Sequence, residues 1–432
     1  MVKETIQDSL DYIEENLKAE ITAKELSDRA GYSLFHFYRI FQGAVGMPVM
    51  QYILKRKLLH AVSEIGAGRK KTDAVLDYGF ETYAGFYRSF LREIGYTPAD
   101  YLRRFKVKTP YRIDLFQEEH IMISHKKAAE MLAYWGLENE KIMDIVFEEN
   151  GETSDSAKYV GDSYVLKYTN NLGNIKKAIA IEKALTEIGL SAPVTVPALD
   201  GREYIENGEL YFFLSKRVEG KGILASHVYL DEYQEKARFI GEIVGQLDLA
   251  LAKIDVPVDD VDVYTHALEW AIPVLRPILP IPEELIARYT AEMDRLFTAL
   301  PRQIIHRDPN PSNIILTEGG FGFIDFDLSE RNVRIFDPCY ASTAILSETY
   351  EDGNEEKLKK WTAIMKEIMY GYDSVVKLTE EEKEAIPWIL LSNQFVATAW
   401  FSEREDKFRD FYEANRKMTV WMMRHIDEMR AF

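Results

Sequence analysis

The sequence predicts a multidomain protein in which an all-α domain precedes a larger α+β domain. Three observations support this prediction: a length of 432 residues, a five-residue pattern that occurs twice near the N-terminus, and two apolar strand-like runs after residue 300 with polar residues between them. A chain of this length exceeds one ordinary hydrophobic core, so two or three domains are expected.

The N-terminal pattern is a duplication. FYRIF spans Phe37–Phe41, and FYRSF spans Phe86–Phe90, 49 positions later. Other residues match at the same offset: Ser33 with Thr82, Gly46 with Gly95, and Tyr52 with Tyr101. A repeat at a fixed offset marks a duplicated structural unit. Two copies are too few for a solenoid, so the sequence predicts a pair of modules.

Each copy has the pattern of a short helix, a glycine turn and a capped second helix. In the first copy Thr22 precedes the short helix, Gly31 supplies the turn and Ser33 caps the second helix. In the second copy Gly79 and Thr82 hold the corresponding positions. This arrangement is typical of a helix-turn-helix motif, and the run YILKRKLLHAVSEI between the copies predicts a helix that connects them.

The residues of the two pentamers divide into a buried set and an exposed set. Helical spacing predicts that four phenylalanines belong to the core: Phe37, Phe41, Phe86 and Phe90. A Tyr-Arg pair repeats at the outward positions, although a purely structural hairpin has no need for it. An exposed arginine on such a helix can contact guanine or a phosphate, and two helices can enter successive major grooves about 34 Å apart.

Residues 5–105 resemble the DNA-binding domain of AraC/XylS-type transcription regulators. The matching segments are SLFHFYRIF (Ser33–Phe41), GMP (Gly46–Pro48), GFETYAGFYRSF (Gly79–Phe90) and REIGYTPADYLRR (Arg92–Arg104). The resemblance implies double-stranded DNA as a partner, with a homodimer as one possible assembly. It also implies base-reading roles for seven residues: Phe35, Tyr38, Arg39, Tyr83, Ala84, Tyr87 and Arg88.

Charge separates the N-terminal region from the rest of the chain. Residues 1–108 contain 17 lysines and arginines against 14 acidic residues, whereas the remaining residues contain 36 against 57. A mildly basic domain before a strongly acidic one indicates that only the first meets a polyanion. We expect a DNA-binding domain over residues 1–108 and a linker over 109–125.

A second motif lies in the acidic region. IIHRDPNPSNIIL (Ile304–Leu316) contains the spacing H-R-D-x-x-x-x-N, which is the pattern of a kinase catalytic loop, and FGFIDFD follows it. Phosphoryl transfer needs a carboxylate that orients the acceptor hydroxyl, which Asp308 can supply. Asn313 and Asp325 offer the hard oxygen ligands that Mg²⁺ takes.

A kinase also needs a cation at the ATP phosphates. In YVGDSYVLKYTN, alternating apolar residues predict a strand with Lys167 near its end, and the helix that follows carries Glu182 as a partner for that lysine. The glycine-rich phosphate loop is thin, because Gly151 and Gly161 do not form a close pair. Backbone amides near Ser154 and Ser156 are an alternative way to hold a phosphate.

Residues 126–432 resemble the aminoglycoside phosphotransferase family, the small-molecule branch of the protein-kinase-like fold. The fold class expected is therefore an all-α tandem helix-turn-helix domain followed by an α+β bilobal protein-kinase-like domain. The resemblance implies a small lobe over residues 126–217 and a large lobe over 218–432, with YFFLSKRVEG as the hinge. It also implies ATP and Mg²⁺ as cofactors and a small-molecule hydroxyl as acceptor.

The same resemblance implies a role for each polar residue of the motifs. Asp308 is the expected catalytic base, and Asn313 and Asp325 are the expected Mg²⁺ ligands. Lys167, held by Glu182, is the expected contact to ATP. His306 is expected to anchor the loop by hydrogen bonds rather than to carry a proton.

Three functions fit these patterns. The first is a transcription regulator whose second domain is a working small-molecule kinase, and the sequence favours it because all the polar kinase positions are present. The second is a regulator whose kinase-like domain only senses a ligand or nucleotide. The third is a metabolic or resistance kinase with a vestigial DNA-binding domain, against which the intact Arg39 and Arg88 argue.

The cysteine content and the apolar segments predict the compartment. The single cysteine, Cys339, excludes an internal disulfide and fits a reducing cytoplasm. The longest uncharged run, residues 385–402, contains Pro387, Asn393 and Gln394, which indicates a buried helix rather than a membrane span. We therefore expect a cytoplasmic protein with no membrane partner.

Overall fold

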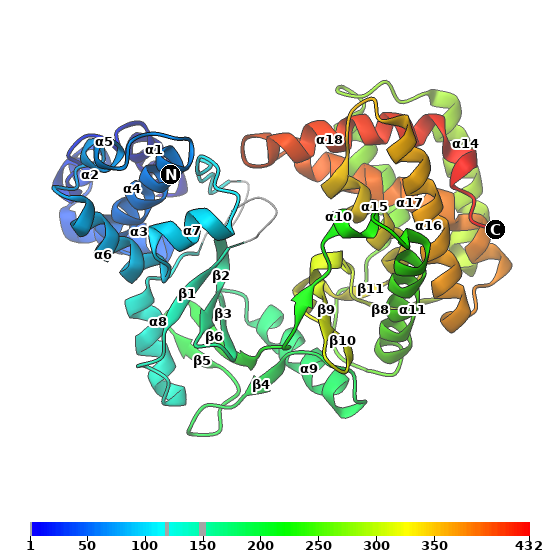
Figure 1. The fold of residues 1–432 in the computed structure, drawn as a ribbon, viewed down its shortest axis with the longest axis horizontal. Helices are drawn as coiled ribbons and strands as arrows, with labels where there is room; N and C mark the ends of the chain where they lie inside the picture. The colour runs from blue at the N-terminus through cyan, green and yellow to red at the C-terminus, as the bar shows by residue number, and fades with distance from the viewer. Residues whose placement is uncertain (1, 117–120, 147–152) are drawn as a thin grey trace. The chain divides into compact units, whose positions relative to one another are not determined.

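The computed structural model describes residues 2–116, 121–146 and 153–432 and divides into two compact units. Unit 1 consists of Met1–Ile175 and Thr195–Arg217, and unit 2 consists of Lys176–Val194 and Val218–Phe432 (Figure 1). Unit 1 therefore contains both the helical N-terminal region and the strands that follow it.

The N-terminal part of unit 1 is a tandem helix-turn-helix arrangement. Its helices are α1 (Val2–Glu15), α2 (Ala23–Arg29), α3 (Leu34–Val45), α4 (Val49–Gly66), α5 (Lys71–Asp77), α6 (Tyr83–Ile94) and α7 (Pro98–Arg104). Helices α2 and α3 form the first motif, α5 and α6 form the second, and α4 connects them (Figure 1). The prediction of a duplicated helix-turn-helix is confirmed.

The local signals in the sequence account for the ends of these helices. The Ser33 hydroxyl accepts a hydrogen bond from the His36 amide at the start of α3, and Thr82 accepts one from Gly85 at the start of α6. Gly31 has φ 71° in the first turn, a left-handed conformation that glycine adopts without a steric penalty. The side chains of Phe37, Phe41, Phe86 and Phe90 are fully buried, as the helical spacing predicts.

A largely antiparallel sheet forms the second part of unit 1. Its strands are β1 (Ile142–Val146), β2 (Thr153–Val160), β3 (Tyr164–Thr169), β4 (Val194–Val196), β5 (Ile205–Asn207) and β6 (Leu210–Lys216). The order is β1-β2-β3-β6-β4, with β5 on β6. Helix α8 (His125–Leu132) and the short helix η1 (Ala133–Trp135) precede β1, and Trp135 donates its indole N–H to the Val196 carbonyl at 2.8 Å.

The strand β2 changes one expectation about the phosphate loop. Ser154 and Ser156 lie within β2 rather than in a loop, and Gly161 lies in the turn after β2 with φ 53°. Gly151 lies outside the described residues. The pairing of β2 with β3 runs over residues 157–160, and the register of β2 with β1 shifts between Thr153 and Lys158, so the two serines lie in an irregular part of the strand.

The segment expected to be a linker is packed against the helical domain. Ile113, Leu115 and Met122 are buried in the same hydrophobic cluster as the helix-turn-helix core. The Met122 amide also donates to the Val45 carbonyl at 2.8 Å, and the Gln7 side chain donates to the Ile113 carbonyl at 2.9 Å. Ile113, Leu115 and Met122 therefore pack with the helical domain, whereas Ile123 belongs to the hydrophobic cluster that α8 and the sheet form.

Unit 2 is mainly helical. Its longer helices are α11 (Tyr233–Leu251), α14 (Glu283–Leu296), α15 (Phe336–Thr349), α16 (Glu355–Val376), α17 (Glu380–Ser402) and α18 (Glu405–Arg424). Shorter helical segments are α10 (Ala225–Val228), α12 (Val263–His266), η2 (Ala267–Ala271), α13 (Ile272–Leu275), η3 (Phe297–Ala299) and η6 (Ile426–Met429). Helix α9 (Leu172–Glu187) begins in unit 1 and continues in unit 2.

Two small sheets in unit 2 carry the catalytic-loop motif. One has the order β10-β9-β7 and contains β7 (Lys221–Gly222), β9 (Ile314–Thr317) and β10 (Gly320–Phe323). The other pairs β8 (Arg302–Ile305) with β11 (Glu330–Val333). The short helices η4 (Pro311–Asn313) and η5 (Phe326–Leu328) lie beside these strands in the sequence.

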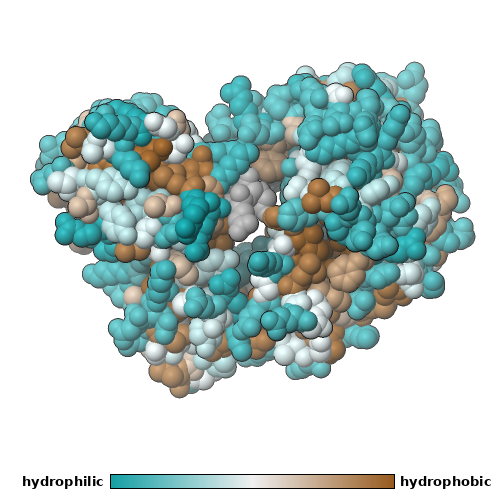
Figure 2. All heavy atoms as spheres, in the orientation of Figure 1, coloured by the Kyte–Doolittle hydropathy of each residue, from teal (hydrophilic) through white to brown (hydrophobic). Residues whose placement is uncertain are grey.

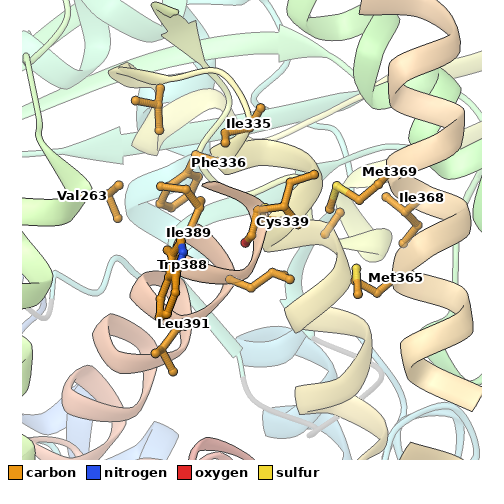
Figure 3. Packing of buried hydrophobic residues seen from close by; sticks show 14 of the residues in the cluster. Val263, Ile335, Phe336, Cys339, Met365, Ile368, Met369, Trp388, Ile389 and Leu391 are labelled. Carbon is orange, nitrogen blue, oxygen red and sulfur yellow. The ribbon is translucent and has the colours of Figure 1, made fainter. Parts of the chain in front are cut away.

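The core of unit 2 lies between α15, α16 and α17. Cys339 is fully buried in this core, together with Ile368 and Ile389 (Figure 3). Burial raises the pKa of its thiol well above the usual range, so this cysteine has a packing role. Within the described part of the chain, none of the helices has the length and apolar character that a bilayer span requires. The face in Figure 2 is mostly hydrophilic with separate apolar patches.

Candidate functional site

The catalytic-loop motif follows directly after β8 in unit 2. Arg307 has φ 71°, a conformation that non-glycine residues adopt rarely and that is common at functional sites. Its guanidinium forms an ion pair with Glu330 at 2.9 Å. The turn at Arg307 ends the strand, so Asp308 leaves the sheet and lies in the loop.

Asp308 and Asn313 contact each other. The Asn313 Nδ2 donates to the Asp308 Oδ2 at 3.2 Å and to the Asp308 carbonyl at 3.0 Å. Tyr340, on α15, lies near the same carboxylate and lowers its pKa, although burial raises that pKa more strongly. The hydrogen bonds from Asn313 therefore hold the carboxylate that the sequence predicts as the candidate base, and the tyrosine beside it was not predicted.

Asp325 approaches the same carboxylate from a second loop. It follows β10, has φ 69° and is exposed. Burial and the charge of Asp325 raise the pKa of Asp308 to about 7. A carboxylate with a pKa near neutrality can accept a proton from an alcohol more readily than an ordinary aspartate can.

A buried carboxyl pair supports the backbone of this loop. The carboxylate of Asp337 accepts hydrogen bonds from the amides of His306 and Arg307 at 2.8 and 2.9 Å. Asp248, on α11, accepts a hydrogen bond from the Tyr372 hydroxyl at 2.6 Å. Burial raises the pKa of both carboxyls, and the negative charge of Asp337 raises the pKa of Asp248 further.

Neither Asp248 nor Asp337 was predicted from the sequence as part of the site. The imidazole of His306 is buried, and its Nε2 lies 3.0 Å from the Ile324 carbonyl. The prediction that His306 anchors the loop is confirmed.

The loop residues fit a divalent cation that also binds phosphate. Because Asn313 gives its amide N–H to Asp308, its side-chain oxygen faces away from that contact, and Asp325 adds an exposed carboxylate. No group of three or more His, Cys, Asp or Glu side chains in the described ranges could hold a metal ion by itself. This donor set matches Mg²⁺, which commonly takes one or two carboxylates together with substrate phosphates.

The other two predicted kinase residues occupy the expected kinds of element. Lys167 lies on β3 in unit 1 and is half-buried, with Ala157 and Phe213 as its neighbours on the adjacent strands. Glu182 lies on α9 in unit 2 and is 3% exposed. Each therefore has the burial of a residue with a fixed position rather than of a free surface charge.

The candidate DNA-reading residues lie on α3 and α6. Phe35 is 81% exposed, which is unusual for a phenylalanine, and Ala84, Arg39 and Arg88 are also exposed. The Arg39 Nη2 lies 3.1 Å from the His36 Nδ1 on the same helix.

The tyrosines of this set are less exposed than the sequence analysis expected. Tyr38, Tyr83 and Tyr87 are all half-buried, and Tyr38 and Tyr83 pack against the domain core. Their rings contribute to the core because residues flanking a buried stripe cover its edge.

Comparison with known proteins identifies both domains. Residues 26–104 match the helix-turn-helix domain family, and residues 148–357 match the phosphotransferase enzyme family. The chain is 30% identical over 97 residues to the HTH-type transcriptional activator AarP of Providencia stuartii, covering 22% of this chain and 72% of AarP. It is 31% identical over 98 residues to the multiple antibiotic resistance protein MarA of Escherichia coli, covering 22% of this chain and 77% of MarA.

A third relative is matched over a smaller share of its length. The chain is 32% identical over 110 residues to the HTH-type transcriptional regulator YbfP of Bacillus subtilis, which is 24% of this chain and 37% of YbfP. All three matches concern the helix-turn-helix region, because their lengths are close to the length of that domain.

Solved structures are similar to the rest of the chain in fold. The microcompartment-associated aminopropanol kinase has a TM-score of 0.52 at 17% identity, over 71% of this chain and 98% of that structure. The amicoumacin kinase hAmiN, in complex with AMP-PNP, Ca²⁺ and Ami, has a TM-score of 0.51 at 15% identity, over 70% and 91%. The chain therefore belongs to the AraC-type helix-turn-helix family and carries, behind that domain, a domain of the phosphotransferase enzyme family with a kinase-like fold.

Proposed function

We propose that this protein is a DNA-binding transcription regulator whose second domain transfers the γ-phosphoryl group of ATP to a hydroxyl group of a small molecule. The observation that carries the proposal is the arrangement around Asp308 in unit 2. The Asp308 carboxylate is buried and accepts a hydrogen bond from Asn313, and the negative charge of Asp325, from a second loop, acts on it.

In this proposal Asp308 orients the acceptor hydroxyl and accepts its proton. The acceptor oxygen forms a bond to the γ-phosphorus while the bond from that phosphorus to the bridging oxygen of ADP breaks. The products are a phosphate ester, ADP and one proton, which the solvent takes from Asp308.

The remaining polar groups hold the donor. Asn313 and Asp325 would bind Mg²⁺, which neutralises charge on the phosphate oxygens when it is present. Lys167 would contact the α- and β-phosphates, with Glu182 as the residue that restrains it. Asp337 keeps the loop backbone in place through the amides of His306 and Arg307, so it acts as a positioning residue.

The DNA-binding half of the proposal depends on the exposed faces of α3 and α6. Arg39 and Arg88 can donate to base edges or phosphates, and Phe35 can contact a thymine methyl group or a sugar. The similarity to AarP and MarA supports this assignment, since the chain spans most of each of those two proteins.

A second function is favoured by one specific observation. The sequence has no close glycine pair between β1 and β2, and the serines that could replace it lie within β2. A domain that binds nucleotide or ligand weakly and does not transfer phosphate would serve as a sensor for the DNA-binding domain.

One experiment separates the two functions. The full chain is incubated with ATP, Mg²⁺ and a panel of aminoglycosides, sugars and amino alcohols, and mass spectrometry detects acceptors that gain about 80 Da, the mass of a transferred phosphoryl group. The proposal predicts transfer by the wild type and its loss in Asp308→Asn. The matched control is Asp427→Asn, because Asp427 lies in the exposed ion pair with Arg288. ATP binding without transfer to any acceptor would support the sensor.

A further inference from the structure

The helix-turn-helix domain and the strands of the small lobe share a buried ionic cluster in unit 1. Its centre is Asp144 on β1, whose side chain is fully buried. Lys55, from α4, lies 2.8 Å from the Asp144 Oδ2, and Lys158, from β2, lies 2.7 Å from the Oδ1. His125, from α8, contacts the Oδ1 at 3.0 Å.

These side chains are removed from solvent. The side chains of Lys55 and Lys158 are 5% and 1% exposed. Buried charges are costly unless each has a partner, so the cluster is stable only while α4 stays against β1 and β2. Lys55 therefore fixes α4, the helix between the two helix-turn-helix motifs, to the sheet.

A second polar contact runs in parallel. Arg56, the next residue on α4, donates from Nη2 to the Tyr111 carbonyl at 2.6 Å. The Tyr111 hydroxyl donates to Asp155 on β2 at 3.2 Å. Two adjacent residues of α4 thus reach the two strands β1 and β2 by different routes.

The helices α3 and α6 also end close to other segments of unit 1. Gly46 ends α3 and Gly95 ends α6, each with positive φ. A Cβ atom at Gly46 would overlap the backbone of Met122, and one at Gly95 would overlap the backbone of Ile142 at the start of β1. The ends of both helices are therefore in direct backbone contact with segments that precede or form the sheet.

The same strands lead to the candidate ATP contact. Lys158 is paired with Leu166 across β2 and β3, and Ala157 is paired with Lys167. The ionic cluster is thus one strand position away from the residue that would meet the ATP phosphates. All of these contacts lie within unit 1.

We propose that the DNA-binding domain and the strands β1–β3 form one cooperative element. In this element the Lys55–Asp144 contact couples the two parts, so that a nucleotide bound at Lys167 increases the affinity of α3 and α6 for DNA. The inference rests on the proposed use of nucleotide by the second domain. Its physical basis is that a ligand which orders the strands also orders the helices packed on them, so DNA binding then costs less conformational entropy. By linkage, DNA strengthens nucleotide binding by the same factor.

The test measures the affinity of the full chain for a duplex that the wild type selects from a random-sequence pool, with and without saturating AMP-PNP and Mg²⁺. AMP-PNP separates nucleotide binding from phosphoryl transfer. The wild type is expected to bind the duplex at least about fivefold more tightly with the nucleotide. Lys55→Met is expected to lose this difference while it still binds both ligands separately.

The matched control is Lys57→Met, since Lys57 lies on the same helix and donates to the Ala19 carbonyl outside the cluster. If Lys55→Met fails to fold, Tyr111→Phe cuts the second contact with less disruption and is expected to reduce the coupling in part. A wild type that binds AMP-PNP with no change in its affinity for the duplex would overturn the inference.

A second readout does not depend on nucleotide. Amide hydrogen exchange of Lys55→Met should show faster exchange in α3, α4, β1 and β2 together, because one cooperative element opens as a unit. Faster exchange confined to β1 and β2 would overturn the inference even if nucleotide binding were absent. If the protein does not bind AMP-PNP, but α3, α4, β1 and β2 all exchange faster in Lys55→Met, the proposed function and the effect of nucleotide on DNA binding are contradicted. The cooperative element itself is then still supported.

Discussion

Asp337 accepts hydrogen bonds from two consecutive amides and so determines the backbone conformation directly before Asp308. We predict that Asp337→Ala lowers kcat for phosphoryl transfer by about 100-fold, because small displacements of a catalytic group cost about this much. The KM for ATP should change little. Steady-state kinetics with an acceptor from the panel, or ATP hydrolysis if none is found, measures both values.

Asp337→Asn is the informative companion variant. Asparagine keeps one acceptor oxygen for an amide of the loop, so it should recover part of the lost rate. Equal losses in the alanine and asparagine variants would indicate that the pairing with Asp248, rather than the contact to the two amides, controls the loop.

Glu14 makes the stability of unit 1 depend on pH. Burial alone would raise its pKa, but the hydrogen bond from His60 and the charge of Arg56 lower the pKa to about 2. A carboxyl whose pKa is lower in the folded state stabilises that state above its unfolded pKa, and this contribution is lost as the pH falls toward 2. The contribution is on the order of 3 kcal/mol for a shift from 4.5 to about 2.

We therefore predict that the protection factors of the amides in α1 and α4, which compare each exchange rate with the intrinsic rate at the same pH, fall below about pH 4.5 in the wild type. Glu14→Gln should exchange faster at pH 7 and should lack the part of the pH dependence that Glu14 causes. A wild type and a variant with parallel pH profiles would contradict the assignment.

Arg39 carries an exposed guanidinium on α3, one of the two helices that we propose read DNA. If it makes a bidentate contact to guanine, Arg39→Ala should weaken binding to the selected duplex by about 1–3 kcal/mol and relax the preference at one base position. Arg103→Ala is the control, because Arg103 is 72% exposed on α7 and pairs with Asp100. Titrations at two salt concentrations measure the effect. A similar loss of DNA affinity in both variants would indicate that Arg39 contributes only its positive charge and does not contact a specific base.

At the scale of elements, the caps of α3 and α6 decide where the DNA-reading helices begin. The side chains of Ser33 and Thr82 each accept an amide hydrogen bond at the first turn. We predict that Ser33→Ala and Thr82→Ala each destabilise the helical domain by about 1 kcal/mol. Urea unfolding followed by hydrogen exchange in α3 and α6 measures the change, and no change in either variant would contradict the role of the caps.

The elements that follow from local patterns could be predicted from the sequence. The Ser33 and Thr82 caps, the turn at Gly31 and the buried phenylalanines depend on residues within one turn of each other, and the structure has them as expected. The proximity of Asp308 and Asn313 also followed from a spacing of five residues.

Long-range contacts could not be predicted in this way. Asp337 accepts a hydrogen bond from the amide of Arg307, which lies 30 residues away in the sequence. Asp248 accepts one from the hydroxyl of Tyr372, which lies 124 residues away. The Lys55–Asp144 ion pair could not be predicted, because a lysine in a basic helix and an aspartate in a strand have the pattern of ordinary surface charges. Their burial depends on packing between segments that the sequence separates by a polar stretch.

At the scale of the whole molecule, the division of the chain differs from the simplest expectation. The sequence suggests a DNA-binding domain, a linker and a bilobal domain, whereas contacts group the helical domain with the sheet that carries Lys167. The packing of Ile113, Leu115 and Met122 explains the difference, because these apolar residues bury themselves in the helical domain's core. A regulator built in this way can link ligand binding to DNA binding within one unit.

Calorimetric titration of ATP into the full chain, with Mg²⁺ and with EDTA, tests the central claim most directly, namely that the second domain uses nucleotide through the Asp308 loop. We predict one binding site that is tighter with Mg²⁺. Asp325→Asn should weaken binding at least about tenfold with Mg²⁺ and little with EDTA, since Asp325 would hold the ion. No heat of binding from ATP under either condition, in a wild type that still binds DNA, would contradict the claim.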